Sequence, residues 1–140
     1  MTNTALEPSR YPNLFRRYLA AVIDGTTIIL LMVSVGRLAS YLGLDQGLAL
    51  FLAIIAVAIY EPFLTAFLFT AGQGAMRFRV RDVQTGGRVP LGRLYLRVVI
   101  KGVLGLISFL TLPARRDRRA IHDLAAGTLV VEASDAKVTK

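Results

Sequence analysis

The sequence predicts an all-α membrane protein, in which a transmembrane helical hairpin is joined by a third helix and by a small pairing of two β-strands. Its 140 residues are 54% hydrophobic with a mean hydropathy of +0.55, and their charges are concentrated in short blocks. Residues 18–36 and 48–71 are apolar with one acid each, and both segments are long enough to cross a hydrocarbon core about 30 Å thick. We expect one membrane domain, 14–132, between a flexible N-terminus, 1–13, and a disordered tail, 133–140.

Composition also limits the chemistry. The chain has no cysteine, which excludes disulfides, thiol catalysis and cysteine-ligated metals, and it has one histidine, so a site with several histidines would need several subunits. We expect no metal and no cofactor. The net charge of +8 would suit nucleic acid in a soluble protein, but here the arginines flank apolar segments. The positive-inside rule and anionic lipids explain that placement better, so we expect a lipid bilayer as partner and no nucleic acid.

The first helix is expected from Leu14 to Leu42. Its apolar run is too long for the core of a signal peptide and contains Asp24, so we interpret it as an uncleaved span. Arg17 precedes Asp24 by two helical turns and shares its face at a different depth. An acid inside a span is costly and indicates a functional site, although it could instead be tied to a neighbouring helix. The short segment 43–47 leads into a second, antiparallel helix, 48–71.

The two helices carry one acid each at comparable depth. Asp24 lies ~10 Å along the axis from Arg17, and Glu61 lies ~16 Å from Gly72, where Arg17 and Gly72 mark the same membrane face. Asp24 and Glu61 are therefore our candidates for ion or proton binding, and we expect them to face each other. Nearby oxygen ligands come from four side chains, Thr26, Thr27, Tyr60 and Thr65. The alternative is two independently buried, protonated acids that hold the helices together.

A strand pattern follows the second helix. Apolar and basic residues alternate from Met76 to Arg81, which predicts a half-buried strand with one basic face. Residues 127–131 predict a second short strand. We expect residues 128–131 to pair with residues 78–83 in the cytoplasm.

A basic amphipathic helix is expected from Leu91. Three basic residues four positions apart share one face, which suits a helix lying in the headgroup layer. The charge-free run 102–114 has 13 residues, which is short for a span, so we favour a re-entrant or interfacial segment over a third transmembrane helix. A dense basic cluster follows at 115–119. The candidates for lipid headgroups are Arg93, Arg97, Lys101, Arg115 and Arg116.

Charge placement predicts the orientation. The residues that flank the two spans are rich in arginine, whereas the only basic residue between Arg17 and Arg77 is Arg37. The positive-inside rule therefore places the N-terminus and the basic strand in the cytoplasm. An even number of crossings keeps the cluster 115–119 on the same side. We expect Arg17 and Asp123 to lie on this face and to approach each other.

Three short motifs follow one another along the chain: Arg17-x-x-Ala20-x-x-Ile23-Asp24, Gly72-Gln73, and His122-Asp123-x-x-Ala126-Gly127-Thr128-x-Val130-Val131. In this order and spacing they resemble the RDD family, a group of small bacterial membrane proteins named for one arginine and two aspartates. The resemblance covers residues 14–132. It implies that the name-giving residues are Arg17, Asp24 and Asp123.

The loop after the second span departs from the family pattern. The family sequence resembles Gly-Gln-Thr-x-Gly-Lys, whereas residues 72–77 read Gly-Gln-Gly-Ala-Met-Arg, without the threonine and the later glycine. The family is described as having no settled function, with cation–proton exchange suggested for some members. The resemblance therefore implies an architecture, in the bacterial inner membrane, more than an activity.

Two functions remain open. In the first, Asp24 and Glu61 exchange a monovalent cation with a proton, because two carboxylates at close range in a low dielectric cannot both stay ionised. Two spans cannot enclose a pathway, so this transporter would be a homo-oligomer. In the second, the protein is a non-catalytic membrane module that binds anionic lipid or assembles with a partner protein, with Arg17 and Asp123 as a structural pair. We expect no enzyme, because His122 and Asp123 are half of a triad without an identified serine.

Overall fold

The computed structural model describes residues 11–109 and 118–133. The expectations for most of the two chain ends, and those for Arg115 and Arg116, lie outside these ranges. Within them, the chain is mostly helical with one small antiparallel sheet.

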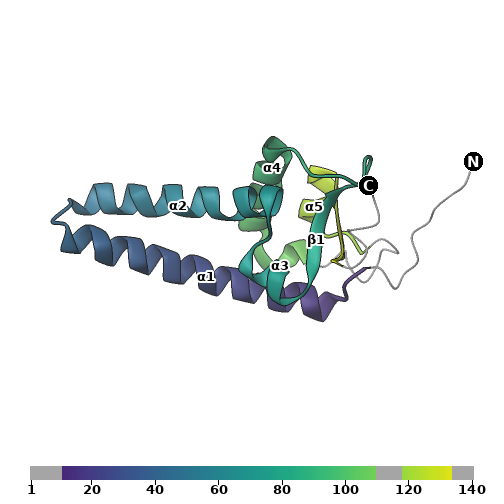
Figure 1. Cartoon of the computed structure of the whole chain (residues 1–140), viewed down its shortest axis with the longest axis horizontal. Helices are drawn as coiled ribbons and strands as arrows, with labels where there is room; N and C mark the ends of the chain where they lie inside the picture. Colours follow the sequence, from purple (N-terminus) through teal and green to yellow (C-terminus); the bar gives the residue numbers. More distant parts are fainter. Residues whose placement is uncertain (1–10, 110–117, 134–140) are drawn as a thin grey trace, which may run out of the picture.

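Two long antiparallel helices form the hairpin that the sequence predicts. Helix α1 runs from Leu14 to Tyr41 and α2 from Gln46 to Phe67, and α2 lies beside α1, whose first turns extend beyond the end of α2 (Figure 1). Asn13 and Asp45 cap them, because each side chain accepts a hydrogen bond from the backbone N–H three residues later. Both helices are long and apolar enough to cross a membrane.

The second helix ends earlier than expected. Instead of continuing to about Ala71, α2 ends at Phe67, and a short helix α3 occupies Ala71–Ala75. Thr70 begins α3, since its hydroxyl accepts a hydrogen bond from the Gln73 N–H. The turn brings α3 back against the first half of α1.

The predicted strand pairing is confirmed. Strand β1, Phe78–Asp82, pairs antiparallel with β2, Thr128–Glu132, in a register that places Val80 opposite Val130. Phe78 and Val80 point into the protein, and Arg79 lies on the other face of β1. The alternation of apolar and basic residues therefore matches the two faces of the strand.

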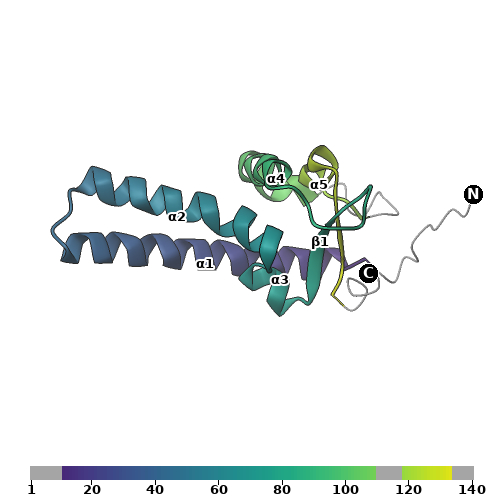
Figure 2. The ribbon, with the colours of Figure 1, turned by 45° about the horizontal axis from the view of Figure 1, so that its top comes forward.

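Helix α4, Leu91–Leu104, runs across the end of the hairpin rather than along it (Figures 1 and 2). A 3-10 turn, Gly105–Phe109, continues it, and α5, Ile121–Ala126, leads into β2. α4 packs against both α2 and α5. Its buried Leu94 joins a small apolar core that also takes residues from α1, α2 and both strands.

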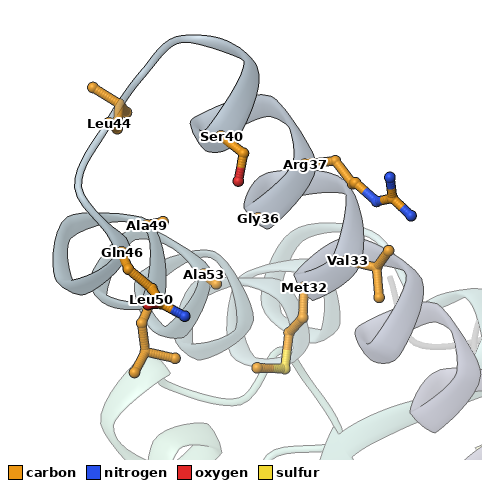
Figure 3. Close-up of a pocket in the computed structure, with 10 residues that line it drawn as sticks. All are labelled: Met32, Val33, Gly36, Arg37, Ser40, Leu44, Gln46, Ala49, Leu50 and Ala53. Carbon is orange, nitrogen blue, oxygen red and sulfur yellow. The ribbon is translucent and has the colours of Figure 1, made fainter.

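These shorter elements form a small domain at one end of the hairpin, where α1 begins and α2 ends (Figure 2). The opposite half of the hairpin consists of α1 and α2 alone among the described residues. There a groove of about 580 Å³ lies between the helices, with Ser40 pointing into it and Arg37 pointing away from α2 (Figure 3). The charged side chains of interest lie at the other end, at the junction with the small domain.

Candidate functional site

Six charged side chains gather where the hairpin meets the small domain, which we call the ion network. Three are basic and three are acidic, and they come from α1, α2, α4 and α5. The members are Arg17, Asp24, Glu61, Arg97, Lys101 and Asp123. All except Lys101 are buried. Charges this deeply buried are stable only when they are paired and hydrogen-bonded.

Asp123 is the central acid of the ion network. It is fully buried and forms ion pairs with Arg17 and with Arg97, whose Nε lies 3.0 Å from Oδ1. The backbone N–H of Ala120 donates a further hydrogen bond, at 3.2 Å. Burial alone would raise the pKa of Asp123, but attraction to the two guanidinium groups outweighs it and holds that pKa well below its usual range. The expected approach of Arg17 and Asp123 is therefore confirmed.

Glu61 pairs with α4 and not with Asp24. The Lys101 ammonium donates to both of its carboxylate oxygens at 2.8 and 2.9 Å, and Arg97 donates at 3.2 Å. The sequence predicted that Glu61 and Asp24 face each other with at least one of them protonated or bound to a cation; the structure instead gives Glu61 two basic partners from α4. The physical reason is that α4 crosses the end of α2 and delivers two cations to its buried acid.

The basic face of α4 contacts protein, which corrects our expectation that it contacts lipid headgroups. Arg97 is buried and Lys101 is engaged by Glu61. Arg93 donates to Asp82 at 2.6 Å and to the carbonyl oxygens of Ala126 and Gly127. A spacing of four residues places basic side chains on one face of a helix. That face can contact lipid headgroups or buried carboxylates, and the spacing does not distinguish between the two.

Asp24 receives hydrogen bonds from neutral donors. The Thr70 hydroxyl donates to Oδ2 at 2.8 Å, and the Gly72 N–H donates to Oδ1 at 2.7 Å. The contact between α1 and α3 requires a glycine, because a Cβ at residue 72 would overlap the backbone of Ala20. Asp24 therefore holds α3 against α1, and Gly72 makes that approach possible.

The four expected oxygen ligands are distributed differently from the prediction. Thr26 and Thr27 donate to carbonyl oxygens four residues earlier in α1, as hydroxyl groups in helices often do. Tyr60 accepts a hydrogen bond from the backbone of Ala71, and Thr65 accepts one from Gln73. None of the four bonds directly to Asp24 or Glu61 among the contacts of the described residues.

A small cavity lies inside the ion network. Its volume is about 20 Å³, roughly what a single water molecule requires. Asp24 and Glu61 both border it, as does Gln73, so the two carboxylates share a cavity although their bonding partners differ. The side-chain oxygen of Gln73 is buried and has no hydrogen-bond donor among the described residues. Buried side-chain oxygens usually accept a hydrogen bond, and the cavity that Gln73 borders is about large enough for one small donor.

Sequence reasoning missed Ser108. Its hydroxyl hydrogen-bonds with Nδ1 of His122, while Nε2 of His122 lies 3.4 Å from Oδ1 of Asp123. The three residue types are those of a hydrolytic triad, but the ring nitrogens are exchanged, since in a triad Nε2 faces the serine and Nδ1 faces the acid. All three side chains are also buried, and Asp123 already pairs with two arginines. The Ser108 hydroxyl has no exposed surface that a substrate could reach in this conformation. The sequence offered no periodic signal for this contact.

His122 gives stability a dependence on pH. Burial, with nearby Arg97, lowers its pKa from 6.5 to about 3. Below pH 6.5 the unfolded chain binds a proton at this imidazole and the folded protein does not. The contribution of the neutral His122 imidazole to the free energy of unfolding is thus complete above pH 6.5. As the pH falls below that value, the free energy of unfolding decreases by up to about 1.4 kcal/mol per pH unit.

We therefore expect wild-type protein to be less stable at pH 5 than at pH 7.5, and the variant His122→Gln to show a smaller difference. Unfolding midpoints at the two pH values measure this. Both values lie above the range in which most carboxylates of an unfolded chain bind protons. An equal pH dependence in the variant would show that another group is responsible.

Comparison with known proteins agrees with this architecture. The model of the RDD family matches residues 11–127. An uncharacterized protein of Haemophilus influenzae is 28% identical over 93% of this chain and 85% of its own length. The uncharacterized protein YckC of Bacillus subtilis is 33% identical over 66% of each chain. No solved structure matches the chain significantly. The chain belongs to the RDD family.

Proposed function

We propose that this RDD-family protein is a multi-pass protein of the bacterial cytoplasmic membrane. Two helices long and apolar enough to span, with large apolar side chains exposed along both, support this location. The basic residues near the start of α1 and on β1 support a cytoplasmic location for the small domain and the N-terminus, by the positive-inside rule. In this arrangement the ion network lies at the cytoplasmic end of the hairpin.

Within that membrane we propose that the protein assembles into a homo-oligomer and exchanges a monovalent cation with a proton. The single observation that carries this proposal is Asp24. It is a buried carboxylate inside an apolar helix, its two hydrogen-bond donors are neutral, and it borders a small cavity together with Glu61. A carboxylate of this kind can bind a proton or a cation in turn. The oligomer is needed because two helices alone cannot enclose a pathway.

The rest of the ion network would act as a gate on the cytoplasmic side. Arg17 and Asp123 join α1 to α5, and Arg97 links Asp123 to Glu61. Access to Asp24 from the cytoplasm requires these pairs to separate. Transport would therefore be coupled to movement of α4 and α5 relative to the hairpin.

Asp24→Asn is the decisive variant. It keeps the size of the side chain and one acceptor oxygen for the Gly72 N–H, and its NH2 group can donate to the Thr70 hydroxyl, but it removes the exchangeable charge. We expect it to abolish pH-dependent cation flux into vesicles that contain the purified protein, while the protein remains folded. Flux of sodium and potassium against an imposed pH gradient is the measurement.

Asp45→Asn is the matched control, because Asp45 caps α2 in the connection and asparagine caps helices equally well. This variant should transport as the wild type does. Wild-type vesicles without cation or proton flux above that of empty vesicles would rule out transport by this protein alone.

A second candidate is a membrane module without transport that binds anionic lipid or assembles with a partner protein. The observation that favours it is charge balance: the three basic and three acidic groups of the ion network compensate one another. Asp24 would then need no bound cation. Under this proposal Asp24→Asn changes stability slightly and vesicles containing the wild type show no flux.

A further inference from the structure

A basic site lies apart from the charge-balanced ion network. A hollow of about 250 Å³ opens where α2 ends, between residues 65–69 and the sheet. Its described lining includes three arginines, Arg79, Arg81 and Arg88, and no acid. At its edge Phe67, Leu68 and Phe69 are 48%, 62% and 42% exposed. A basic hollow beside an exposed apolar edge thus marks the end of the span.

The guanidinium of Arg79 is held in place before any ligand arrives. It lies over the ring of Phe69, 4.2 Å from the ring centroid, and donates to the carbonyl oxygen of Phe78 at 3.1 Å. Phe69 in turn packs on Gly74, where a Cβ would come within 2.6 Å of the ring. Residue 74 is the position at which the family pattern resembles threonine. The missing side chain therefore makes the room that Phe69 occupies.

Two of the three arginines in this hollow lack the acidic partners that the basic groups of the ion network have, among the residues that the structure describes. Neither Arg79 nor Arg88 has a carboxylate partner among the described residues, and Arg88 is exposed. Burial, together with repulsion from Arg81, lowers the pKa of Arg79. An anion bound between these side chains would remove that repulsion.

We propose that this hollow binds the phosphate of an anionic phospholipid in the cytoplasmic leaflet. The acyl chains would lie along the exposed side chains of Phe67 and Leu68, where α2 enters the hydrocarbon core. A zwitterionic lipid fits less well, because its cationic headgroup would meet three arginines and no acid. The proposal rests on the membrane location proposed above and does not depend on transport.

The test uses the full chain solubilised in detergent from the membrane fraction. Native mass spectrometry measures how strongly it retains phosphatidylglycerol compared with phosphatidylcholine. We expect the wild type to prefer phosphatidylglycerol. The double variant Arg79→Gln/Arg88→Gln should bind it about 25-fold more weakly, at about fivefold for each arginine.

Two further variants make the test specific. Arg77→Gln is the control, because it removes one positive charge next to the start of β1, close to Arg79 in sequence but outside the lining of the hollow. This variant should bind phosphatidylglycerol much as the wild type does. The double variant also removes the stacking of Arg79 on Phe69, so Arg88→Gln is measured alone as well. It should weaken binding about fivefold and leave the protein folded, because Arg88 is exposed and has no carboxylate partner among the described residues.

Several outcomes would overturn the proposal. Equal retention of the two lipids, or a double variant that binds phosphatidylglycerol as the wild type does, would show that the hollow is not a binding site for anionic lipid. Inorganic phosphate that binds as tightly as phosphatidylglycerol and displaces it would identify a site for a soluble anion. Absence of the protein from the membrane fraction would instead overturn the proposed location. The fractionation is carried out before any lipid is added, so this outcome is distinguished from a failure to bind lipid.

Discussion

Replacement of Asp123 by asparagine is expected to reduce the free energy of unfolding by about 3–5 kcal/mol, the usual cost of breaking a buried ion pair from one side. Asparagine fills the same space but leaves the buried guanidinium of Arg17 without its carboxylate partner, and Arg97 keeps only Glu61. Arg17 would have to find water, which opens the contact between α1 and α5. Denaturant titration of the protein in detergent micelles measures the change.

Glu132→Gln is the control for this prediction. Glu132 pairs with Arg16, but their side chains are 20% and 35% exposed, so their loss should cost about 1 kcal/mol or less. The comparison separates a buried pair from a partly exposed one at the same end of the molecule. Equal costs for the two variants would show that burial does not set the strength of the Asp123 interactions.

Gly72→Ala should destabilise the protein by about 3 kcal/mol, through overpacking and through loss of a hydrogen bond to a charged group. The new Cβ would overlap the carbonyl of Ala20, and a backbone atom cannot rotate away. α3 would be pushed off α1, and the Gly72 N–H would move away from Asp24. The same titration in micelles measures this loss.

Gly25→Ala provides the matched control, since Gly25 follows Asp24 directly in α1 and a Cβ there meets nothing within 4 Å. In the interior of a helix alanine is favoured over glycine by up to about 1 kcal/mol, so this variant should be neutral or more stable. A Gly72→Ala protein as stable as the wild type would mean that α3 can shift without loss, and that the close approach of α3 and α1 is not required.

The parts of the fold that depend on local periodicity were predictable. Alternation between apolar and basic residues over β1 is a signal within five residues, and it gave the strand and its faces. The pairing of β1 with β2 followed from keeping both basic segments on one side of a membrane. The same charge placement, together with the short third segment, put Arg17 and Asp123 on one face of the membrane and predicted their approach.

The partners of the acids were less predictable. Counting residues from the membrane face gives the depth of Asp24 and Glu61, and both do border one cavity. Depth, however, does not specify the direction in which a side chain leaves its helix. The neighbours of Glu61 come from α4, 36 and 40 residues away, and those of Asp24 come from the turn that ends α2. No pattern in a single helix encodes such contacts.

The contact between Arg17 and Asp123 has a consequence for biosynthesis, because the two residues are 106 positions apart. At usual rates of translation, Asp123 follows Arg17 out of the ribosome about 5–20 s later. Throughout this interval the hairpin can insert, but Arg17 has only water or headgroups as partners. Glu61 likewise has no basic partner until Arg97 and Lys101 have been made. α5 therefore supplies the acid that pairs with the start of α1, and the native end of the hairpin forms only after the elements between α1 and α5 have been made.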